Sequence, residues 1–283
     1  MKQIFIIIII SLCEVYCLYA QRTHEIEPAI LECEYAHTQI VDTLTSRSSQ
    51  QDIMILRIGK NVSQFFSYYA FYADSLWNDP KGEAIAGKLT LEAIRKRDFS
   101  SIPGAKTTRD YIYKNYPEGK LSTYAWIVTD PYVIEEDLPS FQWVITDSTK
   151  IVCGYTCQLA ITDFRGRTYK AWFTPEIPIS NGPWKLSGLP GLILEAYDTQ
   201  NHYHYTLTGI RQTGLKPVEF YNYWNNKYEK IDRIKYLQAS YKSLKDTHPM
   251  RTFKAKTGID LGKDSPSKAQ PVVACDFMEK DYK

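Results

Sequence analysis

The residues of this sequence that could take part in the widest range of chemistry are four cysteines after position 20: Cys33, Cys153, Cys157 and Cys275. In an exported chain an even number favours disulfides, and four cysteines allow three pairings. Cys153 and Cys157 are expected about 13 Å apart on a straight strand. A disulfide needs Cα atoms within about 7 Å, so these two pair only if Gly154 breaks the strand. We expect structural or free buried thiols, with Cys275 tied to Cys153 or Cys157 because a short apolar patch surrounds it.

A second group of residues that could do chemistry, in this case metal binding, consists of His202, His204 and Glu195. The two histidines are two residues apart and therefore share one face of an expected strand. If Tyr197 pairs with His202 across a four-residue turn, Glu195 pairs with His204 on the same face. Two imidazoles and a carboxylate are ligands for zinc or copper. The alternative, which we favour, is a solvent-facing hairpin with a simple Glu–His pair, because threonines continue that face.

Motifs of well-known enzyme classes are absent from the sequence. It contains no Gly-x-Ser-x-Gly, no His-Glu-x-x-His and no phosphate-binding loop. The formal net charge is +2, and acidic and basic residues are mixed along the chain. This balance argues against nucleic acid as a partner. No cofactor is expected beyond the metal considered above.

The first twenty residues have the pattern of a secretory signal peptide. Lys2 precedes an apolar run over residues 4–12, and the small residue Ala20 comes directly before Gln21. The run is too short to span a bilayer, and no second apolar run of about 18 residues follows it. We therefore expect an exported chain without a transmembrane span.

Alternating apolar and polar residues predict a mainly antiparallel sheet. The clearest alternation covers residues 151–162, which we interpret as one strand. The acidic residues 135–137 follow a proline and are expected to form a charged turn, while Arg165 and Arg167 flank a hairpin glycine as exposed arginines. Further strands are expected at 29–42, 53–58, 111–116, 122–129, 142–146, 168–174, 192–197 and 202–208, and helices at 83–97 and from 227 to Pro249.

These elements predict an α+β fold with one curled meander sheet covered by about two helices, because a long meander must curl or be covered to bury its apolar face. The strand order resembles LolA-type half-barrels, which carry lipidated or apolar cargo in the bacterial periplasm. Residues 21–245 are expected to form a single β-rich domain. Residues 246–283 are expected to be a mostly flexible tail, because they are polar and rich in Lys, Pro and Ser.

The segment that organises the chain is residues 171–198. Within it, Leu189-Pro190-Gly191-Leu192 has the order of a type II turn, with Gly191 where φ must be positive. The strand that follows has apolar residues on both faces and is expected to be buried. We predict a buried turn and strand that fix the sheet. The motif consists of Gly188, Leu189, Pro190, Gly191, Leu192 and Ile193.

These six residues, with the Phe-Thr-Pro-Glu-Ile-Pro-Ile run upstream, resemble the GLPGLI family of exported Bacteroidota proteins, whose function is uncharacterised. The resemblance implies a periplasmic or outer-membrane-associated protein, and a TonB-dependent outer-membrane receptor as partner. The function we predict is non-enzymatic: an envelope binding or interaction protein, accessory to outer-membrane uptake or carrying an apolar ligand. The alternative is a metal-dependent or hydrolytic periplasmic enzyme with an unrecognised site.

Two interpretations of the inner face remain at this point. A carrier needs an apolar concavity between the curled sheet and the helices, lined by aromatic and branched aliphatic residues. In a filled core, the apolar stripe of the late helix packs directly on the sheet instead. We favour the filled core slightly, because natural interiors are close-packed.

Overall fold

A single twelve-stranded sheet dominates the computed structural model, which describes residues 23–40, 49–77, 80–98, 102–104, 109–222, 224–246, 254–255, 257–258 and 277–282. The expected signal peptide lies outside these residues. The strand order is β14-β7-β6-β5-β4-β3-β2-β12-β11-β10-β9-β8, and every neighbouring pair is antiparallel except β14 with β7. The chain thus forms two meanders, β2 to β7 and β8 to β12, which join where β2 pairs with β12.

The bounds of the elements are as follows. The strands of the large sheet are β2 Ala29–Ile40, β3 Ser49–Gly59, β4 Ser63–Ser67, β5 Tyr111–Lys114, β6 Lys120–Ile127, β7 Asp130–Asp137, β8 Val144–Val152, β9 Tyr155–Phe164, β10 Arg167–Thr174, β11 Leu192–Asp198, β12 Tyr203–Arg211 and β14 Glu229–Lys230. A separate two-stranded sheet pairs β1 His24–Glu27 with β13 Val218–Phe220, and the helices are α2 Tyr68–Leu76, α3 Pro80–Lys96 and α4 Arg233–Leu244.

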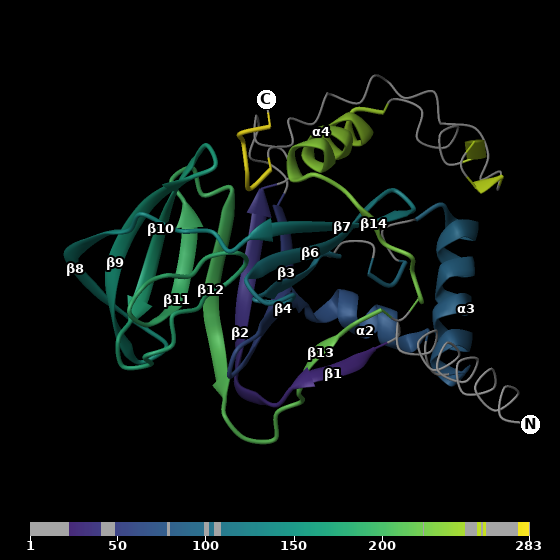
Figure 1. Cartoon of the computed structure of the whole chain (residues 1–283). Coiled ribbons are helices and arrows are strands. Elements are labelled where there is room, and N and C mark those ends of the chain that lie inside the picture. Colours follow the sequence, from purple (N-terminus) through teal and green to yellow (C-terminus); the bar gives the residue numbers. More distant parts are fainter. Residues whose placement is uncertain are drawn as a thin grey trace, which may run out of the picture.

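The large sheet is strongly curled. In Figure 1 the strands β8 to β12 form one wall, and β6 and β7 run across the direction of β2. The thiol of Cys153, in the turn between β8 and β9, donates to the carbonyl oxygen of Leu207 in β12 at 2.9 Å. That contact joins strands separated by β9, β10 and β11 in the order, so the edge of the sheet folds back over its inner face.

The two faces of the sheet are buried by different elements. On β3 the inner face carries Met54, Leu56 and Ile58, which belong to the large core together with β9 to β12. The alternate residue Ile55 faces outward, where it forms a second, mainly aromatic core with Phe66 of β4, Tyr111 and Tyr113 of β5, and Tyr221, which follows β13. Helix α2 contacts β3 and β4, whereas α4 contacts β6 and β7. The predicted α+β architecture, a curled antiparallel sheet covered by helices, is confirmed.

The predicted strand over residues 151–162 is wrong, because a two-residue turn divides it. Val152 pairs with Tyr155, and between them Cys153 and Gly154 have φ angles of 49° and 83°. Two successive positive φ angles make a type I′ turn, the usual connection in a tight hairpin. The apolar alternation runs through this turn without interruption, so Gly154 is the one residue of the pattern that indicates a turn.

Two further elements differ from the predictions. The acidic residues 135–137, expected in a turn, are the end of β7, which pairs along its length with β6. Helix α4 begins at Arg233 rather than near residue 227, because the Asp232 side chain caps it by accepting from the Lys235 N–H at 3.1 Å. The predicted helix at 83–97 is confirmed as α3. No helix among the described residues is long and apolar enough to cross a membrane.

Candidate functional site

The segment between β10 and β11 crosses the inner face and is held there by a buried lysine. Lys114 of β5 donates from Nζ to Asn181 Oδ1, to the Gly182 carbonyl and to the Leu186 carbonyl, each at 2.8 Å. Burial lowers the pKa of Lys114 to about 7. Trp184, in the same segment, is buried with a φ of 53°, a strained conformation for a bulky residue. The chain between β10 and β11, residues 175–191, is called the motif segment below. These contacts hold it in one geometry.

Four residues of the GLPGLI motif are buried as predicted, but Gly188 and Pro190 are exposed, and the glycines have other roles than expected. Leu189, Leu192 and Ile193 are all buried. The left-handed φ of 87° belongs to Gly188, and Gly191 does not have a positive φ. At Gly191 a Cβ would lie 2.1 Å from the carbonyl oxygen of Thr174. The predicted type II turn is wrong, and the close approach of two backbones explains the glycine instead.

A cavity of about 210 Å³ lies on the inner face beside this segment. Its floor is the sheet from β12 through β2 to β7, and its other walls are the motif segment, helix α4 and the C-terminal residues. Most of the lining is apolar or aromatic. The residues that line it include Met54, Phe65, Ile112, Thr123, Ile134, Trp184, Tyr203, Tyr205, Tyr236, Leu237, Phe277 and Met278, with His37, Asp110, Lys185, Arg233 and Glu279 as polar members.

Two strand residues of the lining each have a buried polar atom without a hydrogen-bond partner among the described residues, His37 Nε2 and Thr123 Oγ1, and Ser240 Oγ of helix α4 is a third. His37 is 4% exposed and Thr123 6%. The imidazole of His37 stacks on Tyr205 with ring centroids 4.3 Å apart. Burial lowers the pKa of His37 to about 4, so the ring is neutral at pH 7. Because unpartnered buried polar atoms are costly, this pair marks a place for a hydrogen-bonding guest.

Two more polar groups of the cavity have unusual surroundings. Burial raises the pKa of Asp110 to about 6, although the charge of Lys185 acts in the opposite direction. The hydroxyl of Tyr205 donates to the thioether of Met278 at 3.3 Å, which is a weak acceptor. The cavity is therefore apolar with several under-used hydrogen-bonding groups.

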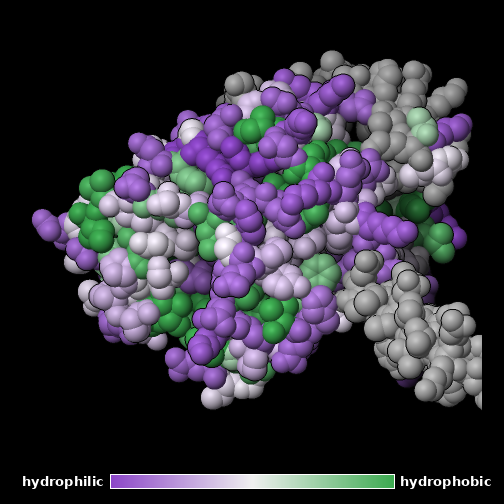
Figure 2. All heavy atoms as spheres, in the orientation of Figure 1, coloured by the Kyte–Doolittle hydropathy of each residue, from purple (hydrophilic) through white to green (hydrophobic). Residues whose placement is uncertain are grey.

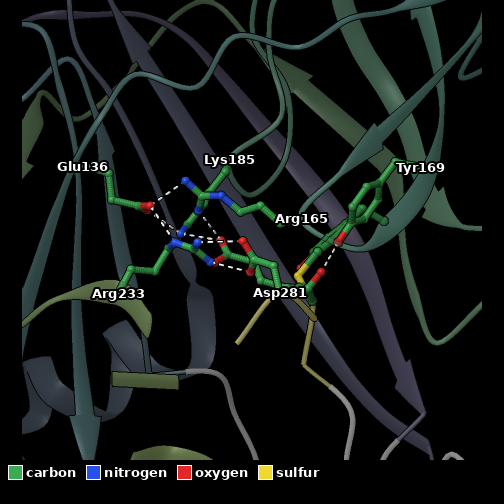
Figure 3. A network of polar contacts seen from close by, with 9 residues as sticks. Glu136, Arg165, Tyr169, Lys185, Arg233 and Asp281 are labelled. Atoms are coloured by element: carbon green, nitrogen blue, oxygen red, sulfur yellow. Dashed lines mark hydrogen bonds and ion pairs between the residues drawn. The ribbon is translucent and has the colours of Figure 1, made fainter. Parts of the chain in front are cut away.

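The C-terminal strap, residues 277–282, covers the cavity and is held by a network of buried ion pairs (Figure 3). Glu279 receives Lys185, Arg165 and Arg233, each at 2.7 Å. Glu136 of β7 receives the same cations, at 2.8, 2.5 and 3.2 Å. Burial alone would raise the pKa of Glu279, but the three cations lower it to about 2. The network therefore joins the strap to β7, the β9–β10 turn, the motif segment and α4.

Backbone contacts complete this attachment. Arg167 Nε donates to the Phe277 carbonyl at 2.8 Å, and the Tyr169 hydroxyl donates to the Met278 carbonyl at 2.5 Å. Arg167 also pairs with Asp198 at 2.7 Å, with both side chains almost fully buried. The two arginines expected to be solvated at the hairpin thus anchor the strap, Arg167 as a buried residue and Arg165 with its side chain 17% exposed. The predicted tail includes a segment that the fold uses, while residues 247–253 and 259–276 lie outside the described part of the chain.

The predicted metal-binding residues are only partly brought together. His204 Nε2 lies 2.9 Å from Glu195 Oε1, and Lys150 also pairs with this carboxylate. The predicted register is shifted by two residues, because Tyr197 pairs with His204 and Glu195 with Thr206. His202 precedes β12 in the turn. In the described parts of the chain, no group of three or more His, Cys, Asp or Glu is placed to hold a metal ion.

The described cysteines are free thiols. Cys33 and Cys157 are buried and Cys153 is exposed. Burial raises the pKa of Cys33 to about 12 and that of Cys157 to about 11, so both are poor nucleophiles. Cys275 lies outside the described residues, and its tie to Cys153 or Cys157 stays a prediction.

Sequence reasoning missed Lys114, His37 and Glu136. Lys114 and Glu136 each carry a charge on the apolar face of a strand, and that position is the signal that could have singled them out. His37 stands at the buried position of an alternating strand, which by itself fits a core histidine. Only the tertiary structure shows that its Nε2 atom reaches a cavity.

Three solved structures that resemble this chain do so at low sequence identity. Residues covering 78% of this chain match 34% of the chain of PNGF-II in one crystal form, with 16% identity and a TM-score of 0.49. A second crystal form gives 15% identity and a TM-score of 0.45. This chain therefore spans about a third of the PNGF-II chain. A domain from Vibrio parahaemolyticus, described as an outer membrane lipoprotein-sorting protein domain, matches with 9% identity, 71% of this chain, 92% of its own and a TM-score of 0.27. Likenesses this distant support no argument.

No curated protein matches the sequence. A family model described as "Protein of unknown function (Porph_ging)", a Bacteroidota-associated domain, matches residues 162–195. This stretch contains the GLPGLI motif together with Arg165, Arg167, Tyr169 and Lys185. The matched residues are thus those that hold the strap and one wall of the cavity.

Proposed function

We propose that this protein is a non-enzymatic binding protein of the bacterial envelope, which holds one small, uncharged and mostly apolar molecule in the inner cavity. The observation that carries the proposal is the pair of unpartnered polar atoms, His37 Nε2 and Thr123 Oγ1, in an otherwise apolar lining. A ligand with one or two hydrogen-bonding groups would satisfy both atoms and bury its apolar body.

The charges around the cavity favour an uncharged ligand. Lys185, Arg233 and Glu279 line it, but they already neutralise one another within the strap network. A charged ligand would have to compete with ion pairs that are already formed, and separating buried pairs is costly. The volume of about 210 Å³ exceeds the roughly 150 Å³ of an engineered cavity that binds benzene, so a single ring or a short chain fits.

Binding of a fluorescent apolar probe to the native protein tests this function. Saturable binding is expected, and Leu237→Trp, which fills the cavity from α4, should abolish it without unfolding the protein. Leu244→Trp is the matched control, because Leu244 is an exposed residue of the same helix. Probe binding that appears only in partly denatured protein would overturn the proposal.

The polar atoms can be tested separately by Thr123→Val, which removes the hydroxyl and keeps the shape. Native mass spectrometry of protein purified from its own periplasm would identify the natural ligand. We expect Thr123→Val to retain less of that ligand, because one of its two hydrogen bonds is lost. Equal retention would remove Thr123 from the site.

An outer-membrane uptake system is the partner we propose, specifically a TonB-dependent receptor. Its support is the resemblance to the GLPGLI family alone. Crosslinking in intact cells followed by affinity purification tests it, and we expect such a receptor among the crosslinked proteins. If no such receptor is found in repeated purifications, the partner is wrong, and ligand binding in the cavity stands as the proposed function without it.

A further inference from the structure

The outer face carries a second pocket, of about 250 Å³, on the opposite side of the sheet from the inner cavity. It lies where the C-terminal part of α2, the turn between β6 and β7, and the chain between β13 and β14 meet (Figure 1). Its volume equals that of about eight water molecules at ~30 Å³ each. This space is large enough for one small ring.

A carboxylate from α2 lies at the bottom of this outer pocket. The Tyr111 hydroxyl donates to Asp74 Oδ2 at 2.8 Å, and Arg109 Nη2 and Trp224 Nε1 approach Asp74 Oδ1 at 3.2 and 3.3 Å. The donors come from two separate segments, residues 109–111 and Trp224, so the carboxylate is fixed from more than one side. Its two oxygens offer about four acceptor sites, and three are used. The guanidinium of Arg109 is about half exposed and keeps further N–H groups.

The walls of the outer pocket are aromatic. Trp126, Trp224 and Tyr228 line it, and Trp224 is 45% exposed. Val128, at the rim, is 49% exposed and has a φ of 59°, which is a genuine outlier for a β-branched residue. Such strain persists where surrounding structure imposes it, and it clusters at functional sites.

We infer that the outer pocket is a binding site for a neutral saccharide, one pyranose ring in size. Asp74 and Arg109 cancel in charge, so neither an anion nor a cation gains from the site as a whole. Flat aromatic walls suit a flat ligand with C–H groups on its faces, and the planar carboxylate and guanidinium suit neighbouring hydroxyls on its edge. A lipid would leave these polar groups unpaired. A sugar ring is neutral, has C–H groups on its faces and carries neighbouring hydroxyls on its edge.

Titration of the full chain with methyl glycosides of glucose, galactose, mannose and N-acetylglucosamine, followed by tryptophan fluorescence and calorimetry, tests the inference. At least one should bind saturably in the millimolar range, and Trp224→Ala should weaken it by about tenfold. Tyr72→Ala is the matched control, because Tyr72 is an exposed aromatic of α2 that does not line the pocket. The Tyr72→Ala variant should bind the glycosides with the same affinity as the unmodified protein.

Two outcomes would overturn the inference. One is the absence of saturable binding of any glycoside in the panel. The other is binding that Trp224→Ala leaves unchanged. Preferential binding of choline or benzoate over every glycoside would show a charged ligand and equally contradict a neutral saccharide. If Trp224→Ala does not fold, Arg109→Gln replaces it, because the Arg109 side chain is half exposed. Because the two pockets lie on opposite faces, failure here leaves the inner cavity unaffected.

Discussion

Single residues of the motif segment have roles that depend on distant backbone. Gly191→Ala would place a Cβ 2.1 Å from the carbonyl oxygen of Thr174, so the strands must separate or the turn must shift. We expect a loss of about 3 kcal/mol, the upper range for overpacking, measured by urea unfolding. Gly87→Ala is the control, because Gly87 lies within α3 with open space at its Cβ. It should stabilise by up to about 1 kcal/mol, and equal effects of the two would contradict the close approach.

Lys114 gives a prediction about pH. Burial lowers its pKa to about 7 from a usual value of 10.5. Between these values the unfolded chain binds the proton and the folded one releases it, so this group makes stability rise with pH over that window. Below pH 7 the cost of burying the charge is present in full. Lys114→Met should therefore show a flatter dependence than the unmodified protein when unfolding free energies are compared from pH 6 to pH 10. Parallel curves would refute this.

The sequence predicted which motif residues are buried, because apolar type alone indicates burial. It did not predict why Gly191 is a glycine, since the clash is with Thr174 on another strand. It also placed His204 directly opposite Glu195, whereas Glu195 pairs with Thr206, because the pairing of β11 with β12 starts two residues later than a four-residue turn implies. Residue types are local, whereas contacts and register depend on the whole sheet.

At the scale of elements, the strap depends on one carboxylate. Glu279→Gln keeps the shape but leaves Arg165, Lys185 and Arg233 with Glu136 and Asp281 as their remaining acidic partners. We expect a loss of about 3 kcal/mol, typical of breaking a buried pair, and faster amide exchange in residues 277–282. Asp137→Asn removes an exposed ion pair with Lys120 and should change little.

Acid should release the same strap. The pKa of Glu279 falls from a usual 4.5 to about 2 in the folded protein. The stabilisation is therefore complete above about pH 4.5 and is lost as the pH falls towards 2. Amide exchange of the strap, measured across this range, should increase before β2 and β3 lose protection. Simultaneous loss in strap and sheet would show that the strap does not open separately.

Alternation predicted most strands but failed where charge is buried. The acidic residues 135–137 predict a turn, yet they form the end of β7, where Glu136 faces the inner side and is neutralised by cations from three distant segments. No local pattern shows such compensation. The turn at Cys153 could not be predicted from alternation either, because the apolar alternation continues across it.

For the whole molecule, one part of the inner face is filled and another holds a cavity, but the late helix α4, which has no buried residue, is not what fills it. The motif segment fills the side formed by β9 to β12, where Phe173, Leu186 and Leu194 are fully buried. Towards β5 to β7 the covering elements are α4 and the strap, and there the cavity remains. The sequence predicted a curled sheet with helical covers. It could not predict the cavity, because its size depends on how closely α4 approaches. Figure 2 shows apolar and polar residues mixed on the outside of this region.

The last prediction concerns how a ligand reaches the cavity. Phe277, Met278 and Glu279 form part of its lining, and the strap makes no strand pairing in the sheet. A chain that ends at residue 276 should therefore keep the sheet while losing one wall of the cavity. We expect an apolar probe to dissociate faster and bind more weakly, as measured by stopped-flow fluorescence. Lys280→Ala, which removes the side-chain hydrogen bond to Gln200 and changes no residue of the cavity lining, should behave like the full chain. An unchanged dissociation rate in the shortened chain would mean that the ligand passes elsewhere, between α4 and the sheet.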